Sequence, residues 1–187
     1  MRAKKEEGKV IEQLDKCLPQ IHCQKCGFVS CLPYAKAIVK KKTDIYKCEP
    51  GGAKVVEKLA EITGERVVGA NIKDPPPQLV YINPEACIGC ALCMQECPVD
   101  AIAGAEGYLH TVIVDECNGC GFCVSSCPVD CITEKKRAEN NPWTNAKAEM
   151  SKTMFYEKRA RKKEPRPEDE KKRIDTLKQV LFREDLS

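Results

Sequence analysis

The sequence predicts an α+β protein in three parts: a small helical domain, an internally duplicated cysteine-rich module and a charged helical C-terminal extension. Three observations support this fold class. Fourteen of the 187 residues are cysteine and only ten are aromatic, so bonds to sulfur are expected to replace part of a hydrophobic core. Twelve of the cysteines fall into three sets of four. Charged residues dominate the cysteine-free stretch after residue 133.

Composition also sets the expected domain boundaries. The helical domain covers residues 1–74, the three consecutive prolines at 75–77 form a stiff linker, the duplicated module covers 78–133, and the charged helical tail covers 134–187. Each region is short, so none can bury a large apolar core by itself.

The expected elements follow from local patterns. Apolar residues at helical spacing predict a short amphipathic helix over Val10–Cys17, and a second helix runs from Ala53 to Thr63 and stops at Gly64. Residues 33–42 also resemble a helix. Residues 79–82 and 111–114 are expected to form short strands, one before each cysteine run of the module.

Two identical cysteine runs define the module. Each has the spacing C-x2-C-x2-C-x3-C followed by a proline, and residues 85–102 aligned on 115–132 give nine identities in eighteen positions. This self-similarity indicates an internal duplication. Three thiolates so close together suit an iron-sulfur cube, whereas a structural zinc usually takes two close pairs from separated loops.

The same spacing is the ligand pattern of bacterial two-cluster ferredoxins, in which the fourth cysteine of each run binds the other cluster. It therefore predicts a ferredoxin-like module with two [4Fe-4S] clusters. One is held by Cys87, Cys90, Cys93 and Cys127, and the other by Cys97, Cys117, Cys120 and Cys123.

A third cysteine set lies upstream. Cys23, Cys26, Cys31 and Cys48 give the spacing C-x2-C-x4-C, then sixteen residues and the last cysteine. Turn-forming glycines and a proline flank these positions, which places the sulfurs on loops. The spacing alone favours a third iron-sulfur cluster and leaves a structural zinc as the alternative.

Residues 10–133 resemble, in order, the B subunit of Rnf-type electron-transport complexes. The motifs are Leu-Pro-Gln at 18–20, C-x2-C-G-aromatic at 23–28, C-x-P-Y-A at 31–35 and K-C-x-P-G-G at 47–52, followed by the two-cluster module. The resemblance implies a [4Fe-4S] cluster on the first cysteine set as well. It also implies an electron-carrier subunit, not a stand-alone catalyst, within an ion-translocating oxidoreductase complex. The partners would be a ferredoxin, a flavoprotein or other Rnf-type subunits.

The sequence departs from that family at two places. Val29-Ser30 stands where the family usually has Pro-Gly before its third cysteine. Membrane-bound members begin with a spanning helix, and here no apolar run reaches the roughly 18–20 residues that such a helix needs. We therefore expect a cytoplasmic protein, either free or peripheral on the inner face of the membrane.

The tail has a different charge from the rest of the chain. Residues 133–187 contain 16 basic and 11 acidic residues, whereas residues 1–132 contain 15 basic and 17 acidic. We expect a helix capped by Asn141 with Pro142 at its first position, and a second helix from Pro167, both lying on the surface of the module. The basic runs 159–163 and 171–173 suit an acidic redox partner or an anionic membrane, and nucleic acid less well.

Two function classes follow from the sequence. The preferred one is an electron-transfer protein with three [4Fe-4S] clusters. The alternative is a metal-stabilised interaction module whose basic tail binds nucleic acid or a partner protein. We expect no catalytic residues, because the sequence contains no phosphate-binding loop and no nucleophile elbow. Cys17 and Cys131 are expected to be free thiols, and His22 and His110 to be packing residues in preference to hydrogen-bond donors near a cluster.

Overall fold

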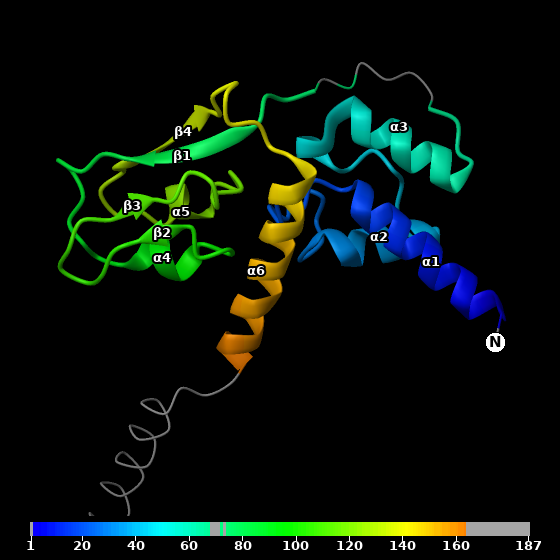
Figure 1. The fold of residues 1–187 in the computed structure, drawn as a ribbon, viewed down its shortest axis with the longest axis horizontal. Coiled ribbons are helices and arrows are strands. Elements are labelled where there is room, and N and C mark those ends of the chain that lie inside the picture. Colours follow the sequence, from blue (N-terminus) through cyan, green and yellow to red (C-terminus); the bar gives the residue numbers. More distant parts are fainter. Residues whose placement is uncertain (1, 68–71, 73, 164–187) are drawn as a thin grey trace, which may run out of the picture. The chain divides into compact units, whose positions relative to one another are not determined.

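The computed structural model describes residues 2–67, 72 and 74–163 (Figure 1). The chain divides into two compact units, residues 1–155 and residues 156–187. The first unit contains all fourteen cysteines. The boundaries expected at residues 75–77 and 134 both lie within this first unit. A division of the chain at these positions remains a prediction.

The N-terminal region is helical. It contains α1 (Arg2–Cys17), α2 (Cys31–Val39), the short 3-10 helix η1 (Glu49–Gly51) and α3 (Gly52–Thr63). Helix α3 ends as predicted at Gly64, which adopts a left-handed conformation with φ of 72°. Helix α1 begins earlier than expected because the preceding residues are Lys- and Glu-rich and favour helix without contributing an apolar stripe.

Apolar side chains from all three helices close a core beneath the cysteine loops. Leu14 and Leu18 from the end of α1, Tyr34 and Ile38 from α2, and Leu59 from α3 are buried together in one cluster. The hydroxyl of Tyr34 donates to the carbonyl of Asp44 at 3.0 Å and accepts from the amide of Lys47 at 3.2 Å. These bonds fix the loop that leads to Cys48.

The cysteine-rich module contains two small antiparallel sheets and two short helices. The elements are β1 (Gln78–Ile82), α4 (Leu92–Glu96), β2 (Ile102–Ala103), β3 (Thr111–Val112), α5 (Phe122–Ser125) and β4 (Ile132–Lys136). Strand β1 pairs with β4, and β2 pairs with β3. Strands flanking different cysteine runs are therefore partners, so the two halves of the module depend on each other.

The first expected strand is confirmed, but the second is shorter than predicted. Strand β3 ends at Val112 because the carbonyl of Ile113 accepts hydrogen bonds from the amides of Glu116 and Cys117, which turn the chain toward the second cysteine run. Together with the helices, these small sheets confirm a mixed helical and sheet fold.

Backbone conformations recur thirty residues apart in the module. Positive φ angles occur at Gly89 and Gly119 (72° and 70°) and at Asp100 and Asp130 (53° and 50°). Each of these aspartates turns the chain toward a strand, Asp100 toward β2 and Asp130 toward β4. The left-handed turn after each Cys-Pro sequence redirects the chain before another helical turn can form.

Helix α6 (Asn145–Lys163) begins later than the expected start at Pro142. The hydroxyl of Thr144 accepts a hydrogen bond from the amide of Lys147 at 3.3 Å, as an N-cap residue does. Trp143 lies before the helix, and its indole N–H donates to the carbonyl of Pro19 at 2.9 Å. The helix expected from Pro167 falls outside the described residues.

The first part of α6 contacts both regions of the first unit (Figure 1). Ser151 donates to the carbonyl of Gln20 at 2.7 Å, and the Lys152 ammonium lies 2.6 Å from the Asp15 carboxylate. Phe155 belongs to the core of the module and stacks on His22 at a ring separation of 4.0 Å. We expected this helix to lie on the surface of the module, and up to Phe155 it contacts both the module and the N-terminal region.

Candidate metal centres

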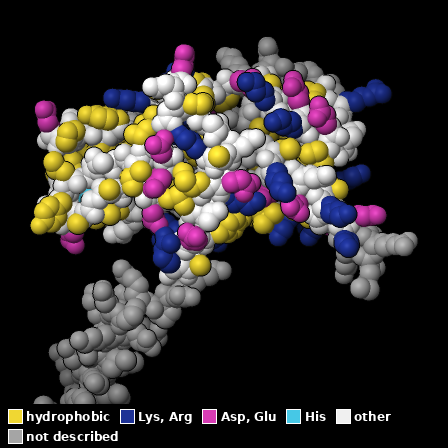
Figure 2. Space-filling view, in the orientation of Figure 1, with side chains coloured by type: hydrophobic (Ala, Val, Ile, Leu, Met, Phe, Trp, Pro, Cys, Tyr) yellow, Lys and Arg dark blue, Asp and Glu magenta, His cyan; other side chains and the backbone are white. Residues whose placement is uncertain are grey.

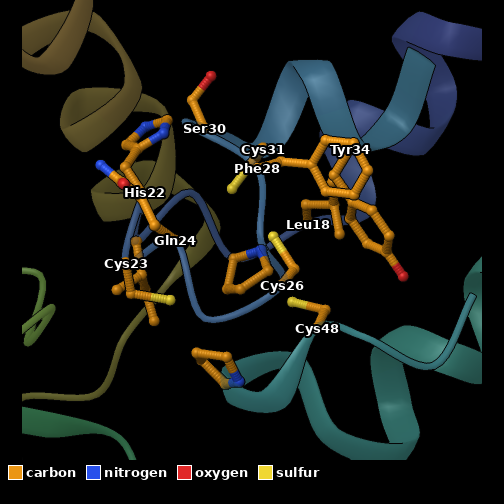
Figure 3. Close-up of a pocket in the computed structure, with 13 residues that line it drawn as sticks. Leu18, His22, Cys23, Gln24, Cys26, Phe28, Ser30, Cys31, Tyr34 and Cys48 are labelled. Atoms are coloured by element: carbon orange, nitrogen blue, oxygen red, sulfur yellow. The ribbon is translucent and has the colours of Figure 1, made fainter. Parts of the chain in front are cut away.

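All four cysteines of the first set line one hollow. The hollow has an empty volume of about 340 Å³ and lies between the end of α1, the loop before α2 and the turn before α3. Figure 3 shows the sulfurs of Cys23, Cys26, Cys31 and Cys48 turned toward this hollow from different sides. Leu18, Phe28 and Tyr34 supply apolar walls. The structure thus brings together four residues that lie up to 25 positions apart in the sequence.

Burial disfavours free thiolates in this hollow. Burial, with the charges of neighbouring cysteines adding to it, raises the pKa of Cys31 and of Cys48 to about 12. The backbone amides of His22 and Gly51 act in the opposite direction by hydrogen-bonding to the two sulfurs. Thiolates in this hollow therefore need bound positive charge, which the irons of a cluster would supply.

A second hollow contains one complete crossover set from the module. Its empty volume is about 270 Å³, and its lining includes Cys97 from the first run with Cys117, Cys120 and Cys123 from the second. Val80, Val99, Ala101 and Ile102 form its apolar part. Burial raises the pKa of Cys123 to about 12 and raises that of Cys120 as well. The amide of Ala101 donates to the Cys97 sulfur at 3.2 Å.

The remaining four predicted ligands also lie together. The charges of Cys90, Cys87 and Cys127 add to burial in raising the pKa of Cys93. His110 is buried between two of these residues, with its Nδ1 atom 3.5 Å from the Cys93 sulfur and 3.6 Å from the Cys87 sulfur. We expected His110 to be a packing residue, and the structure instead gives its ring nitrogen two sulfur neighbours.

Cys131 adds a fifth sulfur to this group. Its sulfur lies 3.4 Å from that of Cys127, and its amide donates to the same Cys127 sulfur at 3.4 Å. Burial, followed by the hydrogen bond with Cys127, raises the pKa of Cys131. Burial also acts to raise the pKa of Cys127, but the amides of Val129 and Cys131 and the Cys131 thiol together lower it. The Cys127 and Cys131 sulfurs are within hydrogen-bond distance of each other, and either can donate. Cys17, the other expected free thiol, is half-buried on α1.

The residues present fit iron-sulfur cubes. Each group offers four sulfurs, the walls are mainly apolar, and backbone N–H groups point at several sulfurs, as in protein sites that hold such clusters. The second and third groups lie close enough for Cys93 to contribute to raising the pKa of Cys123.

Two features are absent from the described part of the chain. No helix there is both long and apolar enough to cross a membrane. No three His, Cys, Asp or Glu side chains there converge on a position for a single metal ion.

Sequence reasoning missed two buried side chains beside the group of Cys97, Cys117, Cys120 and Cys123. Asn118, only 3% exposed, donates to the carbonyl of Ile21 at 2.8 Å and to the Ser151 hydroxyl at 3.2 Å, and its side-chain oxygen accepts from the amide of Cys120 at 3.2 Å. The buried guanidinium of Arg137 donates to the carbonyls of Val114 and Cys117. No local pattern marks these residues, because their partners lie far away in the sequence.

The comparisons with known proteins agree with this geometry. The family model described as a 4Fe-4S dicluster domain matches residues 80–134, and the one described as a putative Fe-S cluster matches residues 18–50. The B subunit of the ion-translocating oxidoreductase complex of Thiobacillus denitrificans is 46% identical over 119 residues, which are 62% of this chain and 63% of that protein. Over this region the chain is homologous to the B subunits of ion-translocating oxidoreductase complexes.

Other B subunits match to a similar extent. That of Azoarcus sp. is 43% identical over 116 residues (60% of this chain and 63% of the relative), and that of Serratia proteamaculans is 47% identical over 113 residues (59% of each). The resemblance found in the sequence motifs is therefore confirmed, and the match includes 4Fe-4S domains. The chain spans about three fifths of the length of these B subunits.

Proposed function

We propose that this chain is an electron-transfer protein that carries three [4Fe-4S] clusters and belongs to an Rnf-type redox complex. The observation that carries the proposal is the composition of the two hollows. Each is lined by one complete set of four predicted ligands, and one of these sets combines cysteines from both runs of the module. A chance grouping of cysteines would not reproduce the crossover pattern of two-cluster ferredoxins.

The proposed ligands follow the three groups. The first cluster is held by Cys23, Cys26, Cys31 and Cys48, the second by Cys87, Cys90, Cys93 and Cys127, and the third by Cys97, Cys117, Cys120 and Cys123. The recurrence of backbone conformation thirty residues apart supports a duplicated module as the source of the last two. Residues 1–74, 78–133 and 134–187 remain the proposed domains, with 75–77 as the linker.

The chemistry divides between cofactor and chain. Bound clusters would supply one-electron oxidation and reduction. The chain's own residues hold the sulfurs apart, exclude water with apolar walls such as Val80 and Val99, and direct amides at the sulfurs to stabilise negative charge. We propose no catalytic residue, because no bond of a substrate is made or broken on this chain.

The proposed partners are redox proteins: a ferredoxin or flavoprotein together with other subunits of an Rnf-type complex. Figure 2 shows hydrophobic side chains gathered on the module, whereas Lys and Arg side chains are frequent over the N-terminal helices. Ile88 and Tyr108, beside the group of Cys87, Cys90, Cys93 and Cys127, are 61% and 72% exposed. These exposed apolar side chains support docking of a protein close to that group. We place the chain in the cytoplasm or peripherally on the inner face of the membrane.

Double substitution tests the crossover assignment. Replacing Cys97 by Ala should remove about four irons per chain, and adding Cys117→Ala should remove no more, because both residues serve one cube. Combining Cys97→Ala with Cys87→Ala should remove about eight irons. Cys131→Ala is the matched control, since it deletes a neighbouring cysteine that is not a proposed ligand, and its iron content should stay unchanged.

The opposite result would refute the assignment. If Cys97 served the same cube as Cys87, their double variant would lose only about four irons, and the Cys97/Cys117 pair would lose about eight. Iron and acid-labile sulfide measured on anaerobically purified variants distinguish the two patterns. A zinc content that replaced iron would refute the electron-transfer proposal itself.

A further inference from the structure

The two halves of the module differ at two positions beside the sulfurs. With the thirty-residue offset of the cysteine runs, His110 corresponds to Val80 and Cys131 corresponds to Ala101. Val80 and Ala101 line the hollow of Cys97, Cys117, Cys120 and Cys123. Their counterparts lie against the other set, Cys87, Cys90, Cys93 and Cys127. One set is thus flanked by two apolar side chains, and the other by two side chains that can donate hydrogen bonds.

The fold makes room for the His110 ring at this place. The residue is 2% exposed, and Gly104 lies directly against its imidazole, so that a methyl group on Gly104 would overlap the ring. The ring nitrogen Nδ1 lies within 3.6 Å of both the Cys87 and the Cys93 sulfur. A packing residue would not need this cradle, because an apolar side chain fills the corresponding place in the other half.

The hydrogen on the ring belongs on Nδ1. A bare Nδ1 would direct its lone pair at two sulfurs that carry negative charge, whereas Nδ1–H donates to them. The other ring nitrogen, Nε2, has no hydrogen-bond partner among the described residues. The sulfurs are therefore the hydrogen-bond partners that this buried ring has, and the N–H is directed at them.

The thiol of Cys131 provides a second donor. It lies 3.4 Å from the Cys127 sulfur, on the opposite cysteine run from the contacts of His110. Hydrogen bonds to ligand sulfurs stabilise the additional negative charge that a cluster takes up on reduction, and so they raise its reduction potential. Ala101, the counterpart of Cys131, offers only its backbone amide, to Cys97.

We infer that His110, assisted by Cys131, is a positioning residue that raises the reduction potential of the Cys87, Cys90, Cys93 and Cys127 cluster through hydrogen bonds to its ligand sulfurs. This inference rests on the proposed clusters. The two clusters of the module would then differ in reduction potential, because the two halves differ at these two corresponding positions. Arg137, by contrast, donates to the carbonyls of Val114 and Cys117 and not to a sulfur.

The inference can be tested by replacing each donor with the residue found at the corresponding position in the other half of the module. His110→Val and Cys131→Ala each install the side chain found at the corresponding position, so each replacement has a precedent in the same fold. Potentiometric titration of the full chain, followed by EPR, gives the midpoint of each cluster. His110→Val should lower one midpoint so that the ratio of reduced to oxidised cluster falls at least tenfold at a fixed potential, about 59 mV for one electron. The other midpoints should stay in place.

Two further variants separate donation from packing. His110→Gln keeps an N–H donor and should recover part of the lost potential, whereas His110→Phe keeps a ring without a donor and should not. Pulsed EPR on protein carrying ¹⁵N only in the histidine rings should show a nitrogen coupling to one reduced cluster, lost in His110→Val and retained in His22→Phe. The chain has only these two histidines, so each coupling can be assigned.

The outcomes distinguish this inference from the function on which it rests. If all variants retain about twelve irons and no midpoint moves in His110→Val, His110 is a packing residue and the inference fails while the clusters stand. Equal midpoints for His110→Phe and His110→Gln would also overturn it. Absence of iron from the unmodified protein would overturn the proposed function instead.

Discussion

Removal of the Asn118 side chain should loosen the junction between the N-terminal region and the module. Asn118→Ala deletes three hydrogen bonds, to Ile21, Ser151 and Cys120, all at 2.8–3.2 Å around a buried side chain. At about 0.5–1.5 kcal/mol each, their loss should lower the free energy of local opening by about 2–4 kcal/mol. Ser151 would keep its bond to Gln20, so the rest of the junction remains formed.

Hydrogen exchange measured by mass spectrometry reads this change directly. Amides in the loop around Ile21 and around Cys120 should exchange about thirtyfold to several hundredfold faster in Asn118→Ala. The matched control is Asn83→Ala, which removes one exposed side-chain bond, to the amide of Glu85 at 3.1 Å. Exchange in Asn118→Ala no faster than in this control would refute the proposed role of the junction.

Two other predictions concern ion pairing and pH. Asp15→Asn should speed cluster loss in denaturant and lower the free energy of unfolding by about 1–3 kcal/mol, because the Asp15 carboxylate is 3% exposed and faces Lys152 at 2.6 Å. Glu12→Gln, which breaks an exposed pair, should leave cluster loss almost unchanged, and equal effects of the two variants would contradict the prediction. Burial lowers the pKa of His22 to about 4. The contribution of the neutral His22 ring to the free energy of unfolding, about 3 kcal/mol, should therefore be complete above pH 6.5 and lost as the pH falls toward 4. His22→Phe, stacked on Phe155, should lack this part of the acid sensitivity of cluster loss; an unchanged pH profile would show that His22 does not cause it.

Sequence reasoning succeeded where chemistry is tied to spacing. Cysteines three residues apart can turn around a common centre, so the grouping of their side chains could be predicted locally. Gly64 can end a helix without strain, so the end of α3 could be predicted as well. Strand β4 and its pairing with β1, by contrast, were not predicted from the sequence.

The features that could not be predicted from the sequence depend on contacts between residues far apart in the chain. Pro142 has the ordinary properties of a first helical residue, but the bond from Trp143 to Pro19, 124 residues away, keeps that segment outside α6. His110 shows no local signal of its sulfur contacts, because Cys87 and Cys93 lie 23 and 17 residues upstream. The one available clue was the departure from the repeat at that position, where the other half has Val80.

The metal content of the unmodified protein tests the three-cluster proposal most directly. Iron and acid-labile sulfide should be measured per chain on anaerobically purified material, with low-temperature EPR after dithionite reduction. About twelve of each, with interacting S = 1/2 signals, is the predicted result. About eight would retain the module's two clusters and remove the one assigned to Cys23, Cys26, Cys31 and Cys48, and zinc in place of iron would contradict electron transfer by this chain.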